Sequence, residues 1–149
     1  MSEEQRGPVE LMDQMYIMAY WMTGSLKKTN NLVYATYQQA DSDISEIELF
    51  RTFRKVFLEQ AASGGTICRH GGSRATREDL VDLLRQEEMD SRLTVLLSEI
   101  CGLSHRAISM VLCKPLGTIR LWLSSGRKSL VDGLLVLLAM ACCEPALAC

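Results

Sequence analysis

The segment that most restricts the fold is residues 102–130, GLSHRAISMVLCKPLGTIRLWLSSGRKSL, which contains two helix starts and one tight turn. Apolar residues recur at helical spacing after Ser104, whose hydroxyl can accept a hydrogen bond from the amides of the following turn. Pro115 disfavours helix at the residue before it and suits the first turn of a new helix. The pattern therefore predicts a helix that stops at Cys113 and a second helix that starts near Pro115, which is a helix-turn-helix unit.

The charge of this segment indicates a partner for it. Residues 102–130 contain five basic residues and no Asp or Glu, so the segment carries +5 and the rest of a chain of net charge −2 carries −7. Basic side chains bind phosphates and gain affinity by releasing counterions, while side chains on the second helix can reach base edges in a major groove. The alternative is a helical hairpin with a solvated basic face. The five basic residues are Arg106, Lys114, Arg120, Arg127 and Lys128.

Apolar spacing along the rest of the chain predicts an all-α protein. Only three prolines occur in 149 residues, and apolar residues recur every three or four positions instead of alternating. We expect two small helical domains joined by a Gly/Ser-rich linker, because residues 61–75 contain four glycines and two serines. The expected divisions are a first domain over residues 1–60, the linker over 61–75, a second domain over 76–135 and an apolar, Cys-containing tail over 136–149.

The periodicity also predicts individual helices. In the first domain we expect three helices, over residues 8–22, 26–40 and 44–60. In the second domain, helices over residues 77–88 and 89–101 are expected before the helix-turn-helix, so that it becomes a four-helix unit. A second basic patch is expected on the outer side of the third helix, at Arg51, Arg54 and Lys55. The residues expected to face inward are Met12, Met15, Tyr16, Ala19, Met22, Leu32, Val33, Thr36, Tyr37, Ala40, Ile47, Phe50, Phe53, Phe57, Leu80, Leu83, Leu84, Leu93, Leu96, Leu97 and Ile100.

The linker and the tail have different expected roles. We expect the linker to let the two halves pack independently or only loosely.

After residue 130 the apolar residues follow no period, and a helix that is apolar all round has to be buried by the same chain or by a partner. Intramolecular docking or self-association is favoured over a membrane, because the apolar run over residues 133–143 is shorter than the ~18 residues that a bilayer needs.

Several classes of protein are not favoured by the sequence. The six cysteines lack the spacing of a disulfide framework or a zinc finger, so we expect reduced thiols, no metal and no cofactor. Cys101 and Cys113 are expected to fill small apolar spaces. The N-terminus has no signal-peptide pattern, which favours a cytoplasmic protein. We expect no enzymatic activity. The chain has only two histidines, His70 in the linker and His105 in the helix-turn-helix, and its sequence contains no nucleophile elbow or phosphate loop.

With these residues in view, the chain resembles the extracytoplasmic-function sigma factors, the small two-domain initiation subunits of bacterial RNA polymerase. Residues 102–130 resemble the fourth region of that family, from the GLS start through a P-x-G-T-[VI]-[KR] turn and helix to a spaced Arg. MTGSLKKTNNLVYATYQQA and ELFRTFRKVFLEQ are similar to parts of the second region. The resemblance implies a DNA-binding transcription initiation factor that binds core RNA polymerase and promoter DNA.

The resemblance also implies which residues make these contacts. The second helix of the helix-turn-helix is expected to face DNA, with contacts from Thr118, Arg120, Leu121, Ser124, Arg127 and Lys128. The helix over residues 26–40 is expected to face the polymerase or another protein partner. The residues expected at protein contacts are Asn30, Asn31, Leu32, Tyr34, Ala35, Gln38 and Trp122.

A second hypothesis is a sigma-like regulator or decoy that binds an anti-sigma factor or another protein without full initiation activity. The connection between the second and third helices is only about a turn long, which leaves little room for the base-capturing loop of the family. Asn30 and Asn31 stand where the family has acidic residues. Leu121 and Trp122 stand where a small polar residue and a basic residue are usual, and an exposed Leu-Trp pair suits a protein pocket.

Overall fold

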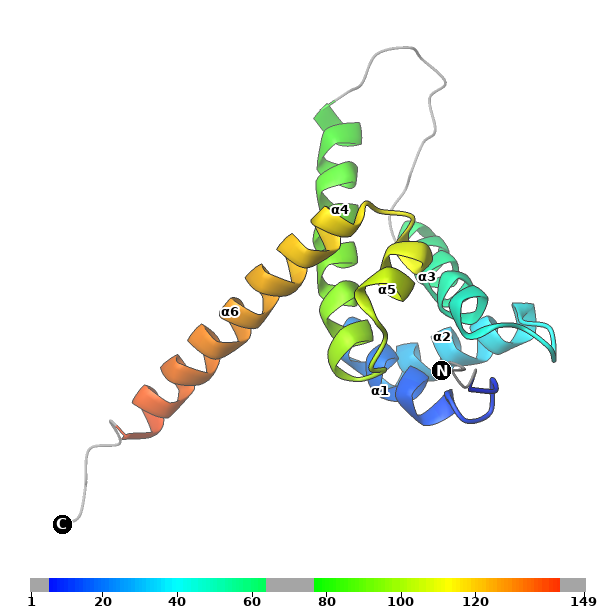
Figure 1. The fold of residues 1–149 in the computed structure, drawn as a ribbon, viewed down its shortest axis with the longest axis horizontal. Coiled ribbons are helices and arrows are strands. Elements are labelled where there is room, and N and C mark those ends of the chain that lie inside the picture. Colours follow the sequence, from blue (N-terminus) through cyan, green and yellow to red (C-terminus); the bar gives the residue numbers. More distant parts are fainter. Residues whose placement is uncertain (1–5, 64–76, 143–149) are drawn as a thin grey trace.

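The computed structural model describes residues 6–63 and 77–142, and within these residues all regular structure is helical (Figure 1). The all-α prediction is therefore confirmed. Linker residues 64–75 and tail residues 143–149 lie outside the described part, together with Cys68, His70, Thr76 and the last two cysteines. The described helices are α1 (Met12–Thr23), α2 (Leu26–Gln39), α3 (Glu46–Ser63), α4 (Arg77–Glu99), α5 (His105–Leu112) and α6 (Leu116–Cys142).

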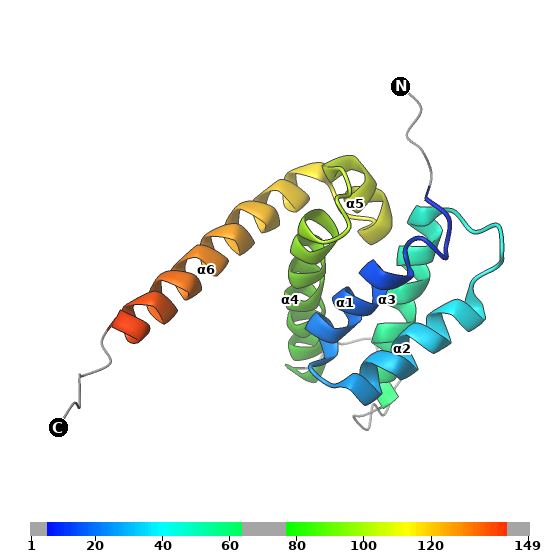
Figure 2. The same ribbon diagram turned by 90° about the horizontal axis from the view of Figure 1, so that it is seen from below.

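The helices form two groups that share one hydrophobic core. α2 packs against both α1 and α3, while α4, α5 and α6 contact one another (Figure 2). The groups meet where α3 packs on α5 and where α1 packs on α4. The expectation of loose packing therefore does not describe this structure, and the two-domain division stays a prediction. The largest fully buried side chains are Leu11, Met15, Met18, Leu32, Leu49, Phe50, Phe53, Leu93, Leu97, Ile108, Ile119 and Leu123.

Two arginines of α3 join the groups. Arg54 donates from Nε and Nη2 to the two carboxylate oxygens of Asp90 on α4, at 2.7 and 2.9 Å, and the Asp90 side chain is 1% exposed. This hydrogen-bonded partner raises the pKa of the Arg54 guanidinium. Arg51 donates from Nε and Nη2 to the Met110 carbonyl of α5, at 2.9 and 2.7 Å. The prediction of an outward basic patch is therefore wrong for Arg54, whose side chain is 20% exposed, whereas Arg51 is 38% exposed but bound to α5, and Lys55 is exposed.

Helix boundaries differ from the predicted ones in the second group. α4 is one helix where two were expected, because neither glycine nor proline interrupts the sequence between residues 77 and 99. The second group consequently has three described helices instead of four. α6 continues to Cys142 and so includes residues that were assigned to the tail. None of the helices in residues 6–63 and 77–142 combines the length and hydropathy needed to cross a bilayer.

Two predicted inner faces are also wrong in part. Met12 and Tyr16 are exposed, while Met15, Met18 and Ala19 form the inner side of α1. Because α1 carries apolar residues on all sides, its sequence has no polar side to define its rotation. Leu80, Leu83 and Leu84 share one face as predicted, but all three are exposed. The N-terminal half of α4 extends beyond α5 and α6, so neither helix covers this face (Figure 1).

Arg54→Ala is expected to lower the free energy of unfolding by about 3 kcal/mol, because it leaves the Asp90 carboxylate buried without its bidentate partner. Urea unfolding followed by circular dichroism measures the change. Lys55→Ala is the matched control, since Lys55 is exposed and lies 3.9 Å from Glu59, and its effect is expected to stay within about 0.5 kcal/mol. Equal stability of the two variants would contradict a stabilising role for the Arg54–Asp90 pair.

Candidate nucleic-acid interface

The helix-turn-helix has the boundaries that the sequence predicts. Ser104 is the N-cap of α5, and its hydroxyl accepts a hydrogen bond from the Ala107 amide at 3.2 Å. The helix ends at Cys113, whose φ of 52° and ψ of 41° place it in the left-handed region, and whose N–H donates to the Ser109 carbonyl. Pro115 then accepts from the Thr118 amide at 3.0 Å as α6 begins.

The turn between α5 and α6 is held by contacts from several sides. The Ser109 hydroxyl donates to the Lys114 carbonyl at 2.6 Å, and the Lys114 amide donates back to the Ser109 carbonyl at 3.2 Å. From outside the turn, Arg51 of α3 donates to the Met110 carbonyl. The angle between the two helices is therefore fixed both locally and by the first group of helices.

The inner side of α6 packs on α5 and α4. Ile119 and Leu123 are buried on this side, as are Ile108, Val111 and Leu112 of α5. Further along, a Cβ atom built on Gly126 would lie 2.3 Å from Val95 Cγ2. A side chain at residue 126 would therefore require the Val95 side chain or one of the two helices to shift, and glycine allows α6 to cross close to α4.

Four of the predicted DNA-contacting residues lie on the outward side of α6. Arg120, Leu121, Ser124 and Lys128 are exposed, and Leu121 is 64% exposed. Within the described residues, neither Arg120 nor Lys128 has a side-chain hydrogen bond or an ion pair. Thr118, near the start of the helix, is half-buried. The outward side therefore presents two cations, one hydroxyl and one apolar side chain.

Two other residues of α6 are occupied by contacts within the chain. Arg127 donates from Nε to Glu99 Oε1 of α4 at 2.9 Å, and both side chains are about half exposed. Trp122 is half-buried and packs against the core, with Lys114 Nζ 6.0 Å from its ring centroid. The expected exposed Leu-Trp pair is therefore wrong for Trp122. Sequence reasoning missed both contacts because their partners lie far away in the chain or across the turn.

The predicted protein-facing residues of α2 divide into two sets. Asn30, Asn31, Tyr34 and Gln38 are exposed, and Gln38 donates from Nε2 to the Tyr34 hydroxyl at 2.9 Å. Leu32 is fully buried in the core, so its side chain cannot contact a partner in this structure. Leu32 is buried because it lies at helical spacing from Thr29, Val33 and Thr36, and these four residues form the inner face of α2. Ala35 lies at the edge of this face and is half-buried.

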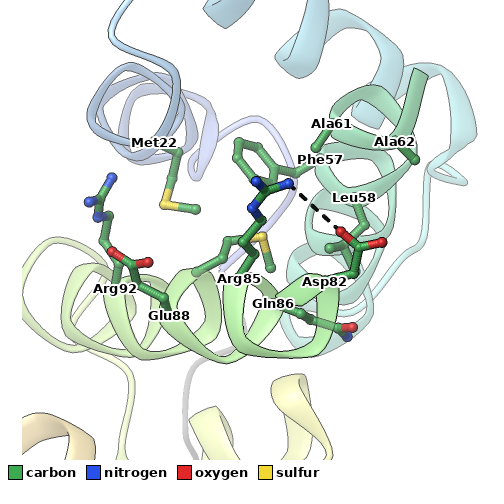
Figure 3. A pocket seen from close by; sticks show the side chains of 11 residues that line it. Met22, Phe57, Leu58, Ala61, Ala62, Asp82, Arg85, Gln86, Glu88 and Arg92 are labelled. Carbon is green, nitrogen blue, oxygen red and sulfur yellow. Dashed lines mark ion pairs between the residues drawn. The ribbon is translucent and has the colours of Figure 1, made fainter. Parts of the chain in front are cut away.

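A cavity of about 470 Å³ lies between the end of α3 and the N-terminal half of α4 (Figure 3). Met22 and Phe57 contribute apolar surface to it, and Asp82 and Arg85 form an ion pair at 3.7 Å among its polar residues. It includes none of the predicted contact residues, and no sequence motif marks it. The other residues that line it are Leu58, Ala61, Ala62, Gln86, Glu88, Met89 and Arg92.

The described cysteines and acidic residues do not form a metal site. In residues 6–63 and 77–142, no group of three or more His, Cys, Asp or Glu side chains is arranged to hold a metal ion. Burial raises the pKa of the Cys101 thiol to about 12, so this thiol stays protonated. The filler role expected for Cys101 agrees with its burial, whereas Cys113 is exposed and the same expectation is wrong there.

The comparisons with known proteins add no family to these observations. No protein-family model matches the chain, and a search of curated proteins found no match.

Cys113→Gly is expected to raise the free energy of unfolding by about 1 kcal/mol, because glycine adopts the left-handed conformation without the steric cost of a Cβ atom. Thermal and urea unfolding measure the difference. Cys113→Ala is the control, since it also loses the weak Sγ contact with the Met110 carbonyl at 3.7 Å but keeps the Cβ atom. A glycine variant no more stable than the alanine variant would rule out strain at this residue.

Proposed function

We propose that the chain is a DNA-binding transcription initiation factor of the extracytoplasmic-function sigma type, which reads duplex DNA with α6 and binds core RNA polymerase. The observation that carries the proposal is the outward side of α6, where Arg120, Leu121, Ser124 and Lys128 are exposed on a helix whose opposite side is buried. A recognition helix in a major groove requires this division between a packed side and a free side.

Each outward side chain suits a different part of a duplex. The Arg120 guanidinium can donate two hydrogen bonds to a guanine edge, whereas the Lys128 ammonium suits a phosphate. Leu121 provides an apolar contact for a thymine methyl group, and the Ser124 hydroxyl can donate to or accept from a base. Arg127 would bind a phosphate only by exchanging its Glu99 partner.

Core polymerase is the second partner in this proposal. The exposed side of α2 presents Asn30, Asn31, Tyr34 and Gln38, which are polar and uncharged. The proposal assigns the polymerase contact to this side of α2 because of the resemblance to the second sigma region. Leu32 has no part in this contact because it is buried.

Substitutions on α6 test the DNA-binding part of the proposal. Fluorescence anisotropy with duplexes selected from a random pool is expected to show that Arg120→Ala weakens binding and changes the preferred base. Lys128→Ala is expected to weaken binding to all duplexes and to lower the slope of log K against log salt concentration by about 1. Lys28→Ala on α2 is the control and is expected to leave binding unchanged.

The ion pair of Arg127 provides a further comparison. Arg127→Ala is expected to weaken binding less than Lys128→Ala, because Glu99 already neutralises Arg127. Glu99→Gln is expected to strengthen binding, since it releases the guanidinium for phosphate. Salt-insensitive binding, or equal effects of all substitutions including Lys28→Ala, would contradict a DNA-reading role for α6.

The alternative function is a sigma-like regulator or decoy that binds an anti-sigma factor or another protein partner. One observation favours it: Leu121, near the centre of the outward side, is 64% exposed, and a large exposed apolar side chain suits a protein pocket. In addition, Lys114 lies over Trp122 and Arg127 is paired with Glu99. The helix-turn-helix therefore has fewer free cations than its five basic residues indicate.

Binding to core polymerase separates the two functions. For an initiation factor, size-exclusion chromatography of the full chain with core polymerase is expected to give a complex, and Tyr34→Ala is expected to weaken it about tenfold, equivalent to about 1.4 kcal/mol. Val9→Ala is the control, because Val9 is a large exposed apolar residue outside α2. Failure to bind core polymerase, with capture of a protein partner that Leu121→Glu abolishes, would favour the decoy instead.

A further inference from the structure

The N-terminal half of α4 has an apolar side that no described residue covers. Leu80, Leu83 and Leu84 follow the i, i+3, i+4 spacing of one helical face and are 55, 53 and 56% exposed. We call these three residues the leucine face. The side of α4 that carries Arg85 and Met89 lines the cavity next to α3 (Figure 3), so the leucine face belongs to neither that cavity nor the described core.

The leucine face lies on the same side of α4 as an existing helix contact. Leu84 precedes Val95 by about three turns of the helix, so the two residues lie on the same side of α4. Val95 is the residue that packs against Gly126, where α6 crosses α4. Ser91 and Glu88 lie on this side between Val95 and Leu84, so the apolar surface resumes at the leucine face, which no described residue occupies.

The chain's own α6 does not occupy this extension. Among the described helices α6 contacts α4 and α5 only, and Figures 1 and 2 both show its C-terminal half projecting away from the rest of the molecule. The sequence of this projecting end, residues 130–142, is LVDGLLVLLAMAC and contains a single charged residue. Each copy of the chain therefore has a projecting helix end of apolar sequence and a leucine face that no described residue covers.

We propose that the leucine face binds the projecting end of α6 from a second copy of the chain, which gives a symmetric dimer. In a two-fold arrangement each copy donates its α6 end and receives the other, so two identical contacts form at once. Both contacts bury the leucine face, whose three side chains are exposed in the single chain. This inference concerns self-association and does not rest on the proposed function.

Sedimentation velocity of the full chain over a wide concentration range tests the dimer. We expect a reversible monomer–dimer equilibrium, in which Leu80→Glu with Leu84→Glu raises the dissociation constant by more than about tenfold. Leu26→Glu is the matched control and is expected to leave the equilibrium unchanged, because Leu26 is 67% exposed on α2. Since all three positions are exposed, the variants are expected to keep the circular dichroism of the unchanged chain.

Mixing two variants identifies the contact itself. Leu134→Glu with Leu138→Glu, in the projecting end, is expected to be monomeric alone, as is the leucine-face variant. A mixture of the two is expected to form a heterodimer, since one intact leucine face then meets one intact α6 end. Four outcomes would overturn the proposal. The full chain could stay monomeric at all concentrations or assemble without end, Leu26→Glu could weaken the dimer as much as the leucine-face variant does, or the mixture could form no heterodimer. Sedimentation of a monomeric chain with phosphatidylcholine vesicles would identify a lipid surface as the occupant instead.

Discussion

The buried carboxylate of Asp90 is the constraint on which the arrangement of the two helix groups depends. A carboxylate that is 1% exposed is unfavourable unless a cation satisfies both of its oxygens, and Arg54 of α3 does so with two hydrogen bonds. This pair holds α3 beside α4. Arg51 lies one turn earlier on α3 and thereby comes within reach of the Met110 carbonyl at the end of α5.

This arrangement makes the helix-turn-helix part of a larger body. The left-handed Cys113 and the Ser109–Lys114 hydrogen bonds define the turn locally, while α3 holds it from outside. The outward side of α6 and the exposed side of α2 consequently belong to one body, because both helices pack on a single hydrophobic core. A partner that displaces α3 would therefore also displace the helix-turn-helix, because α3 packs on α5 and Arg51 donates to the Met110 carbonyl.

The parts of the structure that local chemistry determines could be predicted from the sequence. The Ser104 cap, the end of α5 at Cys113 and the exposure of Arg120 and Lys128 follow from hydrogen-bonding side chains and helical periodicity within a few residues. The left-handed Gly24 after α1 was predictable in the same way.

The parts that depend on distant partners could not be predicted. Arg51 and Arg54 have the pattern of a solvated patch, and only the packing of α3 on α5 and the reach of the Arg54 side chain to α4 reveal their contacts. The leucines of α4 define an apolar face, but periodicity does not say whether a neighbour covers it. Leu32 illustrates a different limit, because a family resemblance assigns a whole segment to a contact and does not separate its buried positions from its exposed ones.

The environments of the two tryptophans have an optical consequence. The chain contains two of them, Trp21 at 64% exposure on α1 and the half-buried Trp122 on α6, so each group of helices carries one indole. An indole in water emits at longer wavelengths than one that is partly shielded, and the two therefore report on separate halves of the molecule. With Trp21 replaced by Phe, the tryptophan fluorescence of the protein would come from the helix-turn-helix alone, which provides a dye-free signal for anything that docks beside Leu121.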